Sequence, residues 1–306
     1  MNATPTSSVP STPIPSSWQL WWMAARPKTL PAAIGPVIAG TAVAIHEGGF
    51  HALSALAALI TALLLQIAAN FANDALDFKK GADTAERTGP TRVTAAGLLT
   101  ADDVLRATWI TLGLAVVSGL YLVWRGGWPF LLLGIAALIC AVAYTGGPFP
   151  ISYLGLGEVF VFLFFGPIAV AGTAYVQTRE LTTLSLAAAI PVGAIAIGIL
   201  IVNNLRDIHT DEKTGKRTVA VRIGVRNTQF EYLAMLIVAA ISPFAFFLAG
   251  WLNWSWLVTL LSWPALYGLW TQITTRTGPQ LNPTFGNTGK TLLLVSSLLA
   301  VALVAS

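Results

Sequence analysis

Two short stretches of the sequence combine acidic and amide side chains at helical spacing. An α-helix turns by about 100° per residue, so the three polar residues of each stretch fall within about 60–80° of one another. Each triplet therefore predicts one polar face at the end of a helix. The triplets are Asn70, Asp74 and Asp77 in residues 70–92, and Asn203, Asp207 and Asp211 in residues 203–224.

Two such faces turned toward each other would place four carboxylates around one cavity, where they would repel one another without compensating cations. The chain has a single cysteine, Cys140, and three histidines. Oxygen ligands without clustered cysteine or histidine favour Mg²⁺ over Zn²⁺. The alternative is that each aspartate is a solvated residue beside a helix end. That alternative explains a single aspartate better than it explains the paired stretches.

The same stretches carry cations that suit a phosphate. Magnesium held by one or two carboxylates usually shares its coordination with substrate phosphate. Arginine contacts phosphate through two donors and lysine acts as a point charge. Arg92, Arg206 and Lys216 are the candidates, although basic residues near helix ends also serve membrane insertion. Neither GxxxxGK[ST] nor GxGxxG occurs, so the sequence shows no nucleotide-phosphate loop.

The elements that must position these residues are membrane helices. The chain is 55% hydrophobic and 10% charged, with a mean hydropathy of +0.72, whereas soluble domains carry about 25% charged residues. A hydrocarbon core of about 30 Å needs about 20 helical residues. We therefore predict an all-α polytopic membrane protein of nine transmembrane helices, with a central cavity open to the cytoplasm. The apolar runs are about residues 30–46, 52–73, 104–124, 128–145, 157–176, 181–203, 230–250, 253–272 and 289–305.

The basic residues predict how these helices are oriented. With nine crossings, all lysines and arginines but Arg125 and Arg179 fall on the side of the N-terminus. This bias predicts a cytoplasmic N-terminus in the cell inner membrane, with both aspartate stretches on the same side. Residues 1–17, rich in Ser, Thr and Pro without a signal-peptide pattern, predict a disordered tail. Residues 18–306 then form one transmembrane domain.

A metal-bound phosphate site beside an apolar interior indicates an amphiphile with a diphosphate head and a hydrocarbon tail, such as a polyprenyl diphosphate. The motifs resemble the two aspartate-rich motifs of the UbiA superfamily of intramembrane prenyltransferases. Within it the chain is most similar to the 1,4-dihydroxy-2-naphthoate prenyltransferases. The resembling stretches are Asn70-x-x-Asn73-Asp74-x-x-Asp77-x5-Asp83, Asn203-Asn204-x-Arg206-Asp207-x3-Asp211-x3-Gly215-Lys216, RPKTLPAAIGP (26–36) and YTGGPFPISYLGLGE (144–158).

The resemblance implies a nine-helix bundle in which two Mg²⁺ ions hold the diphosphate. It implies transfer of a polyprenyl or phytyl group to 1,4-dihydroxy-2-naphthoate with loss of diphosphate and carbon dioxide, which gives demethylmenaquinone or demethylphylloquinone. Arg92, Arg206 and Lys216 would then contact the diphosphate, together with Asn70 and Asn203. The expected catalytic residues and metal ligands are Asp74, Asp77, Asp207 and Asp211, with Asp83 as a further metal ligand.

Three residues are candidates for binding the aromatic substrate: Arg26, Tyr144 and Glu158. Each has a plainer interpretation, as a topogenic charge, an interfacial anchor and a helix first-turn acid respectively. Two other functions stay open. One is prenylation of a different aromatic acceptor, namely 4-hydroxybenzoate, homogentisate or chlorophyllide. The other is ion-coupled transport, which would place the acidic residues near the membrane midplane rather than at helix ends.

Overall fold

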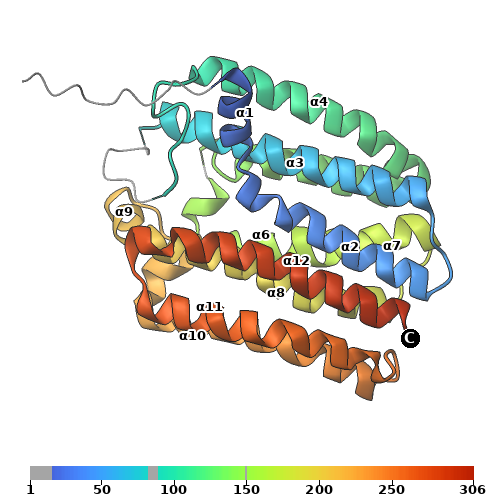
Figure 1. The fold of residues 1–306 in the computed structure, drawn as a ribbon. Helices are drawn as coiled ribbons and strands as arrows, with labels where there is room; N and C mark the ends of the chain where they lie inside the picture. Colours follow the sequence, from blue (N-terminus) through green and yellow to red (C-terminus); the bar gives the residue numbers. More distant parts are fainter. Residues whose placement is uncertain (1–15, 82–88, 149) are drawn as a thin grey trace, which may run out of the picture.

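The computed structural model describes residues 16–81, 89–148 and 150–306, and every regular element in them is helical. The helices run side by side as an elongated bundle, with the short α1 lying across one end (Figure 1). The α-helices are α1 Ser17–Ala25, α2 Pro31–His46, α3 Ala52–Lys79, α4 Ala101–Gly126, α5 Trp128–Ala143, α6 Gly157–Leu163, α7 Ala169–Thr178, α8 Thr183–Arg206, α9 Ile208–Lys213, α10 Val219–Leu248, α11 Trp263–Thr275 and α12 Asn282–Val304.

The predicted membrane character is confirmed at the level of the helices. Within the described residues, six helices are long and apolar enough to cross a bilayer, and the bent pair of α1 and α2 would make a seventh. One of the six, Gly157–Thr178, joins α6 to α7 through a π-helical segment, Phe164–Ile168. All nine predicted apolar runs fall on helical segments. Nine crossings nevertheless remain a prediction, because α5 is shorter and α11 does not meet the same criteria.

The core of the bundle centres on α8, whose apolar window is 72% buried. It packs against α2, α10 and α12, and its buried Ile195, Ile201 and Val202 belong to the largest apolar cluster. The carboxyl ends of α3 and α8, which carry the two predicted polar faces, lie at the same end of the bundle. The C-terminus lies at the opposite end (Figure 1). The fold therefore brings both aspartate stretches to one end.

The contact between α2 and α7 gives a test of this packing. A Cβ atom added at Gly40 would lie 2.3 Å from the carbonyl oxygen of Val170, a backbone atom that cannot move aside easily. Gly40→Ala should therefore lower the free energy of unfolding by about 1–3 kcal/mol, the usual effect of overpacking. The measurement is thermal unfolding in detergent. Gly134→Ala is the matched control, because nothing lies within 4 Å of that position. Equal stability of the two variants would contradict the packing described.

Candidate active site

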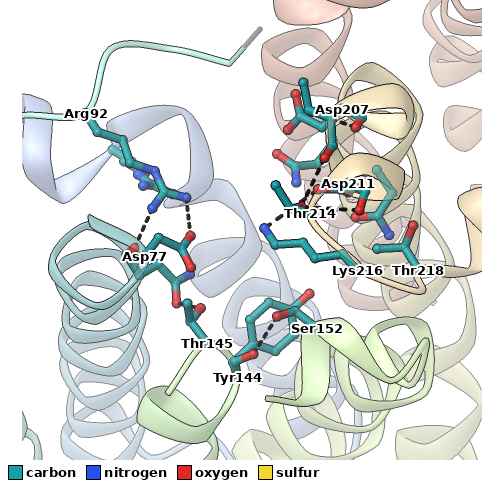
Figure 2. Close-up of a pocket in the computed structure, with 15 residues that line it drawn as sticks. Asp77, Arg92, Tyr144, Thr145, Ser152, Asp207, Asp211, Thr214, Lys216 and Thr218 are labelled. Carbon is teal, nitrogen blue, oxygen red and sulfur yellow. Dashed lines mark hydrogen bonds and ion pairs between the residues drawn. The ribbon is translucent and has the colours of Figure 1, made fainter. Parts of the chain in front are cut away.

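A polar cavity opens at the end of the bundle where the aspartate stretches meet (Figure 2). Three segments far apart in sequence form its walls, and Arg26 from a fourth adds to the lining. Asp77 and Arg92 lie on the first wall, and Asp207, Asp211 and Lys216 lie across from them. The α5–α6 connection forms the third wall. Its lining residues are Tyr144, Thr145 and Ser152.

The first wall centres on an ion pair at the end of α3. A terminal nitrogen of Arg92 lies 2.6 Å from Oδ2 of Asp77, and both side chains are buried. Another nitrogen of Arg92 donates to the carbonyl oxygen of Asn73 at 2.5 Å. Oδ1 of Asp77 is buried and has no hydrogen-bond partner among the described residues. Asp77 thus lines the cavity with one carboxylate oxygen that has no hydrogen-bond donor among the described residues.

Asp74 does not line the cavity. Its buried carboxylate accepts hydrogen bonds from the backbone N–H groups of Val93, at 3.3 Å, and Thr94, at 3.1 Å. The hydroxyl of Thr94 also donates to it. In this structure Asp74 therefore fixes the backbone that directly follows Arg92.

Asn70 likewise lies outside the cavity. Its amide donates to the carbonyl oxygen of Ala25 and to the hydroxyl of Thr29, both at 2.8 Å. These bonds attach the corner between α1 and α2 to α3. Arg26 sits at that corner in the left-handed region, with φ of 52°, and lines the cavity.

The second wall is built from a helix end and the short helix that follows it. Asn203, Asp207 and Asp211 all line the cavity. The prediction that they share one face of one helix is wrong, because α8 ends at Arg206 and Asp207 joins it to the separate helix α9. Asp207 and Asp211 lie one turn apart, since the N–H of Asp211 donates to the carbonyl oxygen of Asp207 at 2.8 Å, and both face the same side of the cavity.

Arg206 is bound to the carboxylate beside it. Its nitrogens donate to both oxygens of Asp207, at 2.9 and 2.6 Å, to Oδ1 of Asn203 at 2.8 Å and to Oδ1 of Asn282 at 3.1 Å. The guanidinium is buried and does not line the cavity. Its position in the structure is therefore that of a partner for Asp207.

Lys216 is the cation of the second wall that faces the cavity. Its ammonium lies 3.6 Å from Oδ1 of Asp211. Burial raises the pKa of the Asp211 carboxyl to about 6, against the opposing effect of Lys216. Asp211 is therefore mostly ionised at neutral pH, and protons compete for it as the pH falls toward 6.

Of the remaining predicted residues, the structure places only some at the cavity. Tyr144 lines the cavity, whereas Glu158 does not and instead accepts a hydrogen bond from the amide of Asn204 at 3.1 Å. Asp83 lies outside the described residues. Asn73 and Asn204 also line the cavity; both belong to the sequence motifs, but neither is among the predicted site residues. The signal was present, because each is a polar residue directly beside a predicted site residue.

The donor set of the cavity fits Mg²⁺ shared with a phosphate. Asp77 on one wall, and Asp207 and Asp211 on the other, offer the oxygen ligands that this ion prefers. Within the described residues, no three His, Cys, Asp or Glu side chains lie close enough to hold a metal by themselves. An ion between these walls would thus need further oxygens from a ligand, of the kind that a phosphate or diphosphate carries.

Comparison with known proteins agrees with this chemistry. The sequence profile of the UbiA prenyltransferase family matches residues 33–304. The chain belongs to this family. Its relatives include the 1,4-dihydroxy-2-naphthoate octaprenyltransferase of Escherichia coli strain K12, which is 41% identical over 80% of this chain and 82% of that protein. The enzyme of the same name from Mycobacterium tuberculosis is 38% identical over 94% of this chain and 98% of its own length.

A solved structure of a UbiA homolog from Archaeoglobus fulgidus, bound to geranyl diphosphate (GPP) and Mg²⁺, has the same fold as this UbiA family chain. Its TM-score is 0.66 at 13% identity, over 94% of this chain and all of that one. This likeness concerns the arrangement of helices.

The bonds to Asp74 predict the effect of removing it. Asp74→Ala would leave the buried N–H groups of Val93 and Thr94 without acceptors, which costs about 1–3 kcal/mol each. We expect faster hydrogen exchange across residues 92–98 and a lower unfolding temperature. The control is Asp102→Ala, which removes a carboxylate that is 75% exposed in its pair with Lys79. Unchanged exchange in the Asp74 variant would contradict this role.

Proposed function

We propose that this chain is a Mg²⁺-dependent 1,4-dihydroxy-2-naphthoate prenyltransferase. It takes a polyprenyl or phytyl group from its diphosphate and gives a demethylmenaquinone or demethylphylloquinone product, with diphosphate and carbon dioxide released. The observation that carries the proposal is the cavity between two carboxylate walls, in a chain 38–41% identical to two enzymes of that name over most of its length.

In the reaction, the bond between the allylic carbon and the diphosphate oxygen breaks, and that carbon bonds to the ring carbon that bears the carboxylate. Carbon dioxide leaves from the same ring carbon, and its bonding electrons restore the aromatic ring. Negative charge builds on the leaving diphosphate while positive charge builds on the prenyl fragment. Donors fixed at the diphosphate end therefore lower the barrier. Arg92 and Lys216, both at the cavity, supply such donors.

Asp77, Asp207 and Asp211 would hold the metal, with Asn203 as a supporting oxygen ligand; all four line the cavity. Two bound Mg²⁺ ions, with Asp83 as a further ligand implied by the family motif, would neutralise the leaving group. Asn70, Asp74 and Arg206 act through their neighbours in this proposal. They position Arg26, Arg92 and Asp207 respectively.

The aromatic acceptor would enter beside the third wall. Tyr144 lines the cavity there, Arg26 lines the cavity from the α1–α2 corner, and Glu158 holds Asn204, which also lines it. A guanidinium suits the naphthoate carboxylate because its N–H donors match a planar carboxylate. We assign Arg26 to that carboxylate, Tyr144 to the ring and Glu158 to the orientation of Asn204.

We further propose nine crossings of the cell inner membrane, with the N-terminus and both aspartate stretches in the cytoplasm. The distribution of basic residues and the helical state of all nine apolar runs support this topology. The family profile, which matches residues 33–304 continuously, supports a single prenyltransferase domain over residues 18–306.

The test of function is transfer of labelled geranylgeranyl diphosphate to 1,4-dihydroxy-2-naphthoate by the purified protein in detergent, with Mg²⁺ or with EDTA. We expect a prenylated product and carbon dioxide in the presence of Mg²⁺ and neither with EDTA. A strong preference for 4-hydroxybenzoate, homogentisate or chlorophyllide would show that the acceptor is that compound and not 1,4-dihydroxy-2-naphthoate. Folded protein that gives no product with any acceptor would point to ion-coupled transport.

The carboxylates predict a second result in the same assay. Asp77→Asn and Asp211→Asn each keep the shape of the side chain and remove a ligand charge, so turnover should fall by more than about a hundredfold. Asp103→Asn is the matched control, because that carboxylate is exposed at the start of α4 and should keep turnover near the wild-type value. Full activity of the Asp77 variant would refute the metal assignment.

A further inference from the structure

The connection between α5 and α6, described at residues 144–148 and 150–156, does more than close the cavity. It contributes Tyr144, Thr145 and Ser152 to the lining. Its beginning is attached to the first aspartate stretch and its end to the second. We name this segment the connecting loop.

Lys80 attaches the beginning of the loop to α3. Its ammonium donates to the carbonyl oxygens of Thr145, at 2.7 Å, and Gly147, at 3.2 Å. Lys80 lies three residues after Asp77 and caps the same helix. The position of the loop is therefore tied to the helix end that presents Asp77.

Backbone contacts attach the end of the loop to the second aspartate stretch. The N–H of Arg217 donates to the carbonyl oxygen of Tyr153 at 3.1 Å, and the side chain of Arg222 donates to that of Leu154 at 2.7 Å. Gly155 has φ of +68°, and a Cβ atom there would lie 2.8 Å from the carbonyl oxygen of Arg217. The two segments are thus too close for a larger residue.

The ring of Tyr153 lies between these two attachments. The ammonium of Lys216 is 5.2 Å from the ring centroid and that of Lys80 is 5.8 Å from it. Both distances are within the range of a cation–π interaction. One aromatic ring therefore contacts a cation from each aspartate stretch.

The ion pair with Asp211 alone does not fix the conformation of the Lys216 side chain. Its distance of 3.6 Å to Asp211 exceeds that of a charge-assisted hydrogen bond, which is about 2.7–2.9 Å. A flexible four-carbon side chain with only this long pair would sample many rotamers. The ring of Tyr153, 5.2 Å from the ammonium, supplies a second contact that restricts these rotamers.

We propose that Tyr153 is a positioning residue for the diphosphate site. Its ring holds Lys216 toward the leaving group and Lys80 on the connecting loop, and so fixes the relative position of the two carboxylate walls. This inference rests on the proposed function and adds to it a residue that no aspartate motif contains. Tyr153 acts on diphosphate affinity through Lys216.

The experiment measures binding of geranylgeranyl thiodiphosphate, whose C–S bond resists cleavage, to the full chain in detergent with Mg²⁺. Tyr153→Leu should weaken binding about 3- to 30-fold, the range that corresponds to one cation–π contact. Tyr153→Phe keeps the ring and should restore affinity to within about twofold of wild type. Tyr267→Leu is the matched control, because that tyrosine is 71% exposed on α11.

A double-mutant cycle then separates positioning from general stability. In a Lys216→Met background, Tyr153→Leu should cause little further loss of affinity. An equal further loss in that background, or wild-type affinity of Tyr153→Leu, would overturn the inference. Tyr153→Met fills a similar volume without a ring and replaces the leucine variant if that protein unfolds.

The failures can be told apart. Wild-type protein that shows no Mg²⁺-dependent binding of the thiodiphosphate would overturn the proposed function, and this inference with it. Wild-type binding with an unaffected Tyr153→Leu variant would overturn the role of Tyr153 alone. The kinetic counterpart is a raised KM for the prenyl diphosphate, with Tyr153→Phe close to wild type.

Discussion

Each carboxylate at the cavity must have a cation, and this requirement shapes the end of the bundle. Asp77 pairs with Arg92, Asp207 with Arg206, and Asp211 with Lys216. A buried charge without a partner costs several kcal/mol, so a missing cation would cost more than most single contacts contribute. Two of the three cations come from segments that leave the helices, near residues 89–99 and 213–218. At this end of the bundle, the two non-helical segments carry Arg92 and Lys216 to their carboxylate partners.

The charges of the side chains that line the cavity have a consequence for what the cavity can bind. Its charged lining consists of three aspartates, two arginines and one lysine, so the formal charges cancel. A divalent cation alone, or a diphosphate alone, would leave a net charge in the cavity. A metal–diphosphate complex brings both signs together and disturbs the balance least. The ion pairs also lie within the walls, which leaves the space between the walls to the ligand.

Hydropathy and spacing were sufficient to predict the helical bundle and the two aspartate stretches, because both depend on local sequence periods. They were not sufficient to predict which way each polar residue points. Asn70 and Asn73 lie on the same helix, yet only the second lines the cavity, because the corner of α1 and α2 occupies the side of Asn70. The end of α8 at Arg206 and the wall formed by the connecting loop depend on tertiary contacts, which no helical period encodes.

The two aspartate stretches have similar spacings of Asn and Asp in the sequence, but their matching residues make different contacts in the structure. Asn203 and Asp207 line the cavity, whereas Asn70 and Asp74 bind backbone next to a cavity arginine. Asn70 holds the carbonyl of Ala25, which precedes Arg26, and Asp74 holds the N–H of Val93, which follows Arg92. A substitution at Asn70 or Asp74 therefore changes the backbone next to an arginine of the cavity, Arg26 or Arg92 respectively. Loss of activity at a motif residue thus identifies a ligand only when the fixed backbone beside it is shown to be intact.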